Sequence, residues 1–260
     1  MPPLFYLLLL FAFILGACIG SFLNVCIYRI PAGESVVKPR SRCPVCGKAI
    51  AWYENIPVLS WLLLRARCSG CGVSISWRYP LVEFLTGALF VEVLWIFGFG
   101  WGTPVYWVFV AMLVAITFID LDHQIIPDVI SLPGIVIGFA ASFLLPWVGW
   151  LDSLIGVLVG GGSLLAIALG YQLLTGKEGM GGGDIKLLAM IGAFLGWQAV
   201  LPVVLFASLS GTLVGVPLML AKGEGGKLAL PFGPFLALGA LVQLFWGREI
   251  FSWYLSFFVS

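Results

Sequence analysis

The sequence predicts an all-α, polytopic membrane protein with about eight transmembrane helices and a zinc-stapled cytoplasmic loop domain. Three observations predict this class. Of the 260 residues, 61% are apolar and only 10% are charged, whereas a soluble domain carries roughly 25% charged residues. The apolar residues fall in long blocks, as membrane-spanning helices require. Four cysteines lie in two closely spaced pairs within the one long polar segment.

Seven apolar blocks define the predicted helices. They run over 4–27, 81–98, 104–119, 129–149, 153–174, 185–221 and 229–247. A helix needs about 20 residues to cross the bilayer core, so the block 185–221 is too long for one span and short for two. The polar break Gly196-Trp197-Gln198 is its natural division. The chain is therefore expected to have eight spans, of which the sixth is short.

The basic residues predict the orientation of these spans. With the N-terminus outside, twelve of the thirteen lysines and arginines face the cytoplasm, Lys177 and Lys227 among them, and only Arg248 lies outside. Loops rich in lysine and arginine stay in the cytoplasm. We therefore expect a multi-pass membrane protein with the loop 28–80 in the cytoplasm. The net charge of +1 does not point to nucleic acid, and no such partner is expected.

The loop 28–80 contains a four-cysteine motif. It reads C-x2-C-x21-C-x2-C, from Cys43 and Cys46 to Cys68 and Cys71. Each pair can bend around one ion, and four thiolates complete the tetrahedron that zinc prefers. Because four protein thiolates leave no open position, the predicted zinc is structural. A polar loop with few apolar runs gains stability from such a metal staple.

Two aspartates locate the predicted chemistry. Ionisable residues at the edge of a membrane span are costly and are functional candidates by default. The third span ends with Asp120, and the sixth begins at Asp184, directly after three glycines at 181–183. The predicted topology puts both aspartates on the cytoplasmic side, although sixty-four positions separate them.

The short sixth span also predicts a depth for Asp184. Residues 185–197 make a helix of about 20 Å, whereas the hydrocarbon core is about 30 Å thick. A helix of this length that reaches the outer face begins below the inner face, so Asp184 would lie in a dip. Irregular backbone at that depth needs cover from protein or a water-filled cavity. The glycines at 181–183 leave room for a substrate strand.

Two neighbouring carboxylates suit peptide hydrolysis. They cannot easily both ionise, so one holds a proton. The ionised carboxylate can activate water while the protonated one polarises the scissile carbonyl. From these residues alone, an ion-coupled transporter that uses the same aspartates stays open. Asp122, Asp128 and His123, the one histidine, are expected at the membrane interface, and either aspartate there could support catalysis or cap a helix.

The chain resembles the type IV prepilin peptidases, the bifunctional leader peptidases and N-methyltransferases of type IV pilus and type II secretion systems. The resemblance covers nearly the whole length. It rests on the four-cysteine loop and on six further motifs, at residues 20–29, 54–61, 78–83, 119–122, 181–184 and 231–235. The four-cysteine loop is what the transporter alternative leaves unexplained. A presenilin-like intramembrane protease shares the G-x-G-D motif but would recognise other substrates.

The resemblance implies catalytic roles for Asp120 and Asp184. It implies as substrate a prepilin or pseudopilin with a short basic leader, cut after a glycine where an apolar helix begins. It also implies methylation of the new N-terminal residue with S-adenosylmethionine. We expect the donor in the basic loop, which could instead bind membrane lipid or the leader. The expected domains are a first helix over 1–27, a zinc-binding loop domain over 28–80 and a protease core over 81–260.

Overall fold

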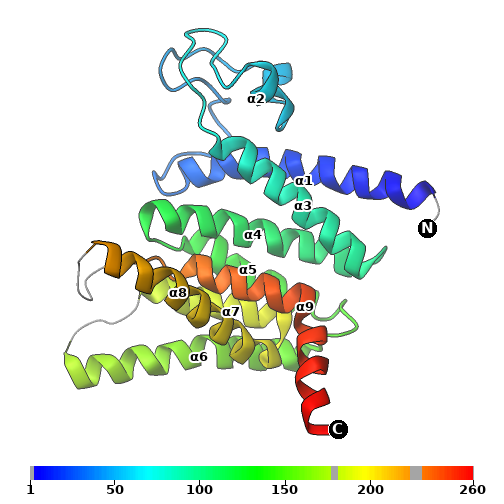
Figure 1. Cartoon of the computed structure of the whole chain (residues 1–260), viewed down its shortest axis with the longest axis vertical. Coiled ribbons are helices and arrows are strands. Elements are labelled where there is room, and N and C mark those ends of the chain that lie inside the picture. Colours follow the sequence, from blue (N-terminus) through cyan, green and yellow to red (C-terminus); the bar gives the residue numbers. More distant parts are fainter. Residues whose placement is uncertain (1–2, 177–180, 223–229, 260) are drawn as a thin grey trace. The chain divides into compact units, whose positions relative to one another are not determined.

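Helices form nearly every apolar segment in the computed structural model, and its described residues contain no strand (Figure 1). The structure describes residues 3–176, 181–222 and 230–259, so Lys177 and Lys227 of the predicted cytoplasmic loops lie outside it. The chain divides into two compact units, Met1–Ala115 and Ile116–Ser260. The predicted all-α class is confirmed.

The first unit is built on a pair of long helices. They are α1 (Pro3–Arg29) and α3 (Arg78–Phe97), and between them run the short helices η1 (Trp52–Asn55) and α2 (Leu59–Leu63). A Cβ placed on Gly16 would lie 2.8 Å from the Cα of Gly87, and one on Gly20 would lie 2.7 Å from the Cα of Glu83. The two helices therefore pack backbone against backbone, as small residues allow in a membrane. Helix α4 (Gly102–His123) begins in this unit and ends in the next.

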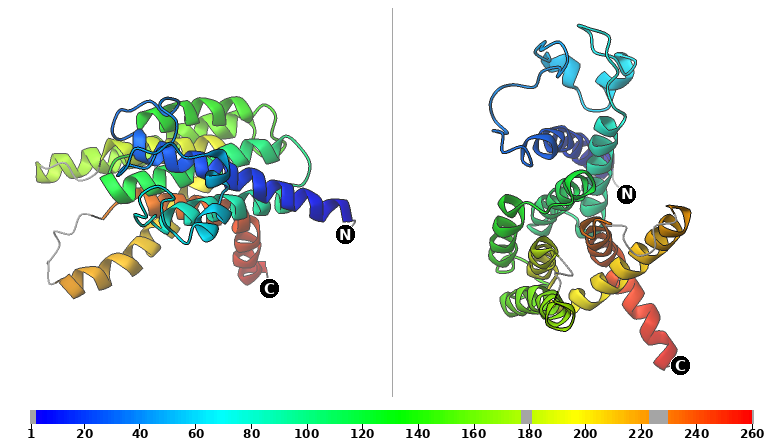
Figure 2. Two further views of the ribbon diagram at one scale, coloured as in Figure 1. Left: turned by 90° about the horizontal axis from the view of Figure 1, so that it is seen from above. Right: turned by 90° about the vertical axis from the view of Figure 1, so that its left-hand side faces the viewer.

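The second unit surrounds one short helix. Its elements are α5 (Asp128–Ala141), α6 (Trp150–Thr175), α7 (Gly182–Leu195), η2 (Trp197–Ala199), α8 (Val200–Lys222) and α9 (Gly233–Val259). Every residue of α7 from Leu187 to Phe194 is buried, because α5, α6, α8 and α9 all contact it. Helices α6 and α7 run side by side in Figures 1 and 2. A helix apolar on all sides is what such a central position requires.

The described residues contain a helix for each of the eight predicted spans, but the eight-span prediction is not exact. Six helices of the described residues are long and apolar enough to cross a membrane, whereas α5 and α7 have 14 residues each. The predicted break is confirmed, since α7 ends at Leu195 and Gly196 has a φ of +81°. The span predicted over 129–149 is wrong, because α5 ends at Ala141. Pro146 lies just beyond that end, and the residue before a proline avoids helical geometry.

Candidate active site and metal centre

Asp120 lies in the last turn of α4 and is held by the start of α9. Asp120 is buried, with only 4% of its surface exposed. The backbone N–H of Gly233 donates a hydrogen bond to its Oδ2 atom at 3.0 Å. The first N–H groups of a helix have no partner inside that helix, so the start of α9 has this donor to give. The carboxyl of Asp120 is therefore fixed by an element 113 positions away in the chain.

Asp184 reaches the same place from the first turn of α7. It is half-buried, and it lies close enough to Asp120 for the charge of that carboxylate to act on it. Ile126 packs against the starts of α7 and α9, next to the end of α4 that carries Asp120. A Cβ on Gly183 would lie 2.9 Å from the Cβ of Ile126, and a Cβ on Gly233 would lie 3.2 Å from its Cδ1. The structure thus brings the two predicted aspartates together.

Two glycines of this site, Gly183 and Gly233, are needed for space. A Cβ on Gly233 would lie only 2.6 Å from the Oδ2 of Asp120. Gly181 and Gly182, by contrast, have nothing within 4 Å of a Cβ. The approach to Asp184 is therefore open, while the contact between α9 and Asp120 is closed to any side chain. Sequence reasoning noted Gly233 only as part of the motif 231–235, although a glycine directly before Pro234 signals a helix start.

Asp128 and Lys186 join the starts of α5 and α7. The Nζ of Lys186 lies 2.6 Å from Oδ1 and 2.8 Å from Oδ2 of Asp128. Both side chains are substantially exposed, so the ion pair adds little stability. The pair links the first turn of α5 to the first turn of α7, which carries Asp184. Asp122 and His123 lie exposed at the end of α4.

The four loop cysteines of the first unit come together. The sulfur atoms of Cys43 and Cys71 are 3.9 Å apart, those of Cys46 and Cys68 are 4.0 Å apart, and all four lie within 4.8 Å of one another. A tetrahedron with metal–sulfur bonds of about 2.3 Å has sulfur–sulfur edges of about 3.8 Å. The cluster therefore fits one tetrahedral ion.

The two cysteine pairs form matching knuckles. In the first, the N–H of Gly47 donates to the carbonyl of Cys43 at 2.9 Å, and in the second the N–H of Gly72 donates to the carbonyl of Cys68 at 2.8 Å. Both glycines have φ near +70° (71° and 72°), where other residues are strained. The N–H groups of Cys71 and Gly70 lower the pKa of the Cys68 thiol to about 6, and those of Cys46 and Val45 lower the pKa of Cys43.

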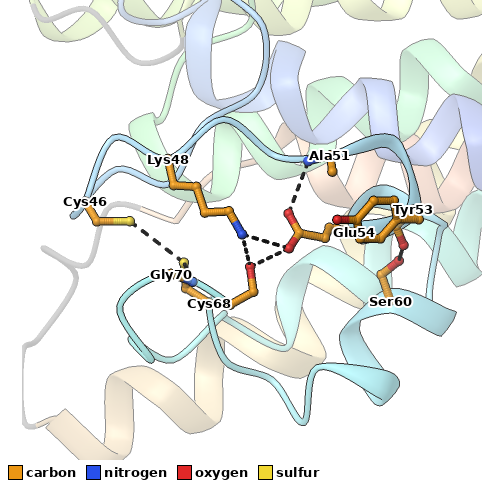
Figure 3. Close-up of polar contacts among 9 residues, drawn as sticks. Cys46, Lys48, Ala51, Tyr53, Glu54, Ser60, Cys68 and Gly70 are labelled. Atoms are coloured by element: carbon orange, nitrogen blue, oxygen red, sulfur yellow. Dashed lines mark hydrogen bonds and ion pairs between the residues drawn. The ribbon is translucent and has the colours of Figure 1, made fainter.

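A polar network links the two knuckles (Figure 3). The Nζ of Lys48 donates to the Oε1 of Glu54 at 3.0 Å and to the Oγ of Ser69 at 2.6 Å. Ser69 donates to the same carboxylate at 2.5 Å, and the N–H of Ala51 donates to its Oε2 at 3.1 Å. These bonds, first that of Ser69, lower the pKa of Glu54 to about 2. Glu54 thus joins the first knuckle, through Lys48, to the second.

The segment after Glu54 is anchored on helix α3. Val58 has a φ of 62° and a ψ of −48°, and the N–H of Leu59 donates to the carbonyl of Pro57 at 2.6 Å. This is a rare γ-turn, strained for a β-branched residue. The N–H of Val58 donates to the Oε2 of Glu83 at 2.7 Å. Glu83 is only 8% exposed and also bonds the hydroxyl of Ser21 on α1.

Comparisons with known proteins cover both units. A model described as the bacterial Peptidase A24 N-terminal domain matches residues 14–97. A second, described as the type IV leader peptidase family, matches residues 107–216. No solved structure matches the chain.

Three relatives named prepilin leader peptidase/N-methyltransferase illustrate the similarity. The protein of Myxococcus xanthus is 51% identical over 83% of this chain and 64% of that protein. The protein of Aeromonas hydrophila is 42% identical over 99% of this chain and 96% of its own length. That of Pseudomonas aeruginosa is 38% identical over 94% and 92%. The similarity therefore extends over both aspartates and all four loop cysteines.

Proposed function

The chain belongs to the type IV leader peptidase family, and on that premise we propose that it is a membrane-embedded aspartic protease that removes the leaders of prepilins or pseudopilins. The observation that carries the proposal is the convergence of Asp120, Asp184 and the Gly233 amide in one unit. The ion-coupled transporter and the presenilin-like protease considered from the sequence have no such support from the relatives.

Asp120 and Asp184 divide the work of hydrolysis. The N–H of Gly233 stabilises negative charge on Asp120, so Asp120 is the ionised member and Asp184 keeps the shared proton. Asp120 takes a proton from water as the oxygen attacks the scissile carbonyl, and Asp184 gives its proton to the carbonyl oxygen. When the tetrahedral intermediate collapses, the leaving amine takes up the proton held by Asp120. The hydroxyl proton returns to Asp184 as the carbonyl of the leader re-forms.

The four-cysteine cluster would hold zinc in a structural role. Cys43, Cys46, Cys68 and Cys71 offer four sulfur ligands at tetrahedral spacing, and four thiolates leave the ion no free position for substrate. The metal would supply folding stability to the loop and no chemistry to the reaction. The network around Glu54 supports this role, because it ties both knuckles together.

A second activity, N-methylation of the new pilin N-terminus, follows from the names of the relatives. S-adenosylmethionine, when bound, would supply the methyl group. The donor is polar and enters from the cytoplasm, and the loop 28–80 is the largest polar segment of the chain. We therefore assign donor binding to the first unit.

The protein is an integral membrane protein, and we propose the bacterial inner membrane as its location. Twelve of its thirteen lysines and arginines fall in segments that the positive-inside rule puts in the cytoplasm. Asp120 and Asp184 lie at the cytoplasmic ends of α4 and α7 in this orientation. A leader translated in the cytoplasm would therefore meet the aspartates on its own side of the membrane.

Cleavage of a purified prepilin tests the proposal. Asp120→Asn and Asp184→Asn should each reduce leader removal to background, because neither amide can exchange the required proton. Asp152→Asn is the matched control. Asp152 belongs to the same unit, and within the described residues it accepts hydrogen bonds from Trp197 and Gln198, which an amide oxygen also accepts. Substantial cleavage by either dyad variant would remove that residue from the mechanism.

A further inference from the structure

A cavity of about 310 Å³ lies along the last turns of α1 in the first unit. Five residues of α1 line it, and we call them the α1 stripe: Cys18, Ser21, Phe22, Val25 and Arg29. Residues three, four and seven positions apart share one face of a helix. The other wall comes from the chain between Val36 and Ser41 and from Asn55 of η1. The cavity therefore follows one face of α1 from its apolar part to its basic end.

The α1 stripe has the length of one membrane leaflet. Eleven positions separate Cys18 from Arg29, which at about 1.5 Å per residue is about 17 Å. Half of a hydrocarbon core of about 30 Å is about 15 Å. Arg29 is the last residue of α1 and its one charged residue, so it belongs at the membrane interface. The rest of the stripe then lies at the depth of the acyl chains.

The basic end of the cavity carries two arginines. Arg29 and Arg40 line it, and no acidic residue is among the described residues that do. Arg29 is only 9% exposed and donates one hydrogen bond, to the carbonyl of Ser35 at 2.9 Å. No buried side-chain nitrogen of the described residues lacks a partner, so the remaining donors of Arg29 are accessible. A guanidinium fork of this kind binds a phosphate group in bidentate fashion.

The wall that carries Asn55 is held in place from two directions. Its neighbour Glu54 is bonded to the metal knuckles, and the N–H of Val58 donates to the buried Glu83 of α3 at 2.7 Å. The carboxylate of Glu83 also bonds Ser21 of the α1 stripe. Both walls are therefore tied to the same side chain, and the cavity keeps its shape before a ligand enters.

We propose that this cavity binds one anionic phospholipid, such as phosphatidylglycerol, from the leaflet at the basic end of α1. The phosphate lies between Arg29 and Arg40, and the head-group hydroxyls bond Ser41 and Asn55. An acyl chain follows the α1 stripe into the membrane. Basic pockets beside membrane-spanning helices recognise lipid head groups in this way. The inference rests on the chain being an integral membrane protein and not on either proposed activity.

The lining also predicts which lipid binds best. Phosphatidylethanolamine has the same phosphate but adds an ammonium group, which finds two guanidinium groups and no carboxylate among the described lining residues. Phosphatidylglycerol has hydroxyls in that place. With the same acyl chains, phosphatidylglycerol should therefore bind more tightly. Glycerol 3-phosphate has the phosphate without the chains that cover the α1 stripe, and it should bind much more weakly than either lipid.

Lipid binding to the full-length protein in detergent tests the site. The delipidated protein is titrated with each lipid, and bound lipid is counted by native mass spectrometry. Arg40→Ala should weaken the binding of phosphatidylglycerol by about tenfold or more. Arg29→Lys keeps the buried charge but loses the fork, and it should weaken binding severalfold. Arg42→Ala, which removes an exposed arginine outside the cavity wall, should bind as the wild type does.

Two further measurements locate the lipid and check the fold. Phosphatidylglycerol with a photoreactive acyl chain, added at one molecule per protein, should label the peptide 18–25 of α1. Zinc content should be the same in the wild type and all three variants, which shows that the loop folds in each. Labelling spread evenly over the spans would overturn the site.

Other results would also overturn the proposal. Equal binding of phosphatidylglycerol and phosphatidylethanolamine would show that the arginines do not select the head group. Wild-type lipid binding by both Arg40→Ala and Arg29→Lys would put the lipid elsewhere. Glycerol 3-phosphate that bound as tightly as the lipid would make this a site for a soluble anion. Unchanged lipid binding with weaker binding of uncleaved prepilin would assign the arginines to the substrate.

Discussion

The backbone amide of Gly233 acts at the scale of a single residue, because it positions Asp120 from 113 positions away. Gly233→Ala should lower prepilin cleavage by about a hundredfold, since an error of about 1 Å in a catalytic group has that effect. The added Cβ would lie 2.6 Å from the Oδ2 of Asp120 and push the carboxylate aside. The measurement is the initial rate of leader removal by purified protein.

Gly162→Ala is the control for that substitution. Gly162 lies in α6, and a Cβ there meets nothing within 4 Å. This variant should cleave at the wild-type rate. Equal cleavage by Gly233→Ala and Gly162→Ala would show that the Gly233 contact does not position the base.

The lowered pKa of Glu54 predicts that the stability of the loop depends on pH. Its pKa is lowered from 4.5 to about 2 in the folded protein. The ionised carboxylate therefore contributes its full stabilisation above pH 4.5, and this is lost as the pH falls through about 2. Glu54→Gln should lower the melting temperature at pH 7, and the difference from the wild type should narrow steadily below pH 4.5.

Tryptophan fluorescence can follow this melting, because Trp52 and Trp61 flank Glu54. Glu34→Gln removes an exposed carboxylate elsewhere in the same loop and should leave the pH profile unchanged. A difference between wild type and Glu54→Gln that stayed constant from pH 7 to pH 3 would contradict the assigned role of Glu54.

The residues that sequence reasoning found are those whose side chains carry the chemistry. Asp120, Asp184 and the four cysteines stand out because charge at a membrane edge and C-x2-C spacing are visible in one segment. Gly233 and Glu83 were not singled out. The first acts through its backbone, and the second through a bond to the amide of Val58. Such roles depend on which distant segment packs nearby, which a local pattern does not encode.

At the scale of elements, the crossing of α6 and α7 depends on two glycines. A Cβ on Gly156 would lie 2.2 Å from the carbonyl oxygen of Gly192, and one on Gly192 would lie 2.1 Å from that of Gly156. Ser153 adds a hydrogen bond to the carbonyl of Ala193 at 2.7 Å. Because α7 carries Asp184, this crossing sets the position of half of the proposed dyad.

Gly156→Ala should destabilise the second unit by roughly 1–3 kcal/mol, as overpacking does. Gly162→Ala, on the same helix in open space, gains helix propensity without a clash and should be neutral or stabilising. Thermal unfolding in detergent compares the two. If Gly156→Ala melts no lower than Gly162→Ala, the backbone contact is not a constraint on the fold.

Sequence patterns predicted some helix ends but not others. The break after Leu195 could be predicted because Gly196-Trp197-Gln198 interrupts the apolar block. The end of α5 could not, since residues 142–149 are largely apolar and only Pro146 and Gly149 oppose a helix. Hydropathy measures whether a segment can be buried, and it does not separate a buried helix from a buried irregular connection.

At the scale of the whole molecule, packing and function divide the chain differently. Packing gives the units Met1–Ala115 and Ile116–Ser260. The predicted division into a first helix, a loop domain over 28–80 and a protease core over 81–260 concerns roles, and it stays a prediction. The metal cluster belongs to the first unit, and the proposed dyad belongs to the second. Each proposed activity can therefore be altered by substitutions within one unit.

The proposed orientation can be tested on intact cells. A thiol reagent that does not cross the membrane should label Gly100→Cys, between the second and third spans, from outside. It should not label Glu34→Cys in the loop 28–80 until the cells are opened. Both positions are exposed, so a failure to react reports the membrane and not burial. Labelling of Glu34→Cys from outside would reverse the assigned topology.

Because the metal ligands come from two separate knuckles, they are synthesised at different times during translation. Twenty-two positions separate Cys46 from Cys68, and a chain grows at about 5–20 residues per second. The first knuckle thus leaves the ribosome about 1–4 s before the second, with half of the ligands that a tetrahedral ion needs. Metal capture has to await Cys71, and a translational pause between the pairs would lengthen the interval in which Cys43 and Cys46 stand exposed to oxidation.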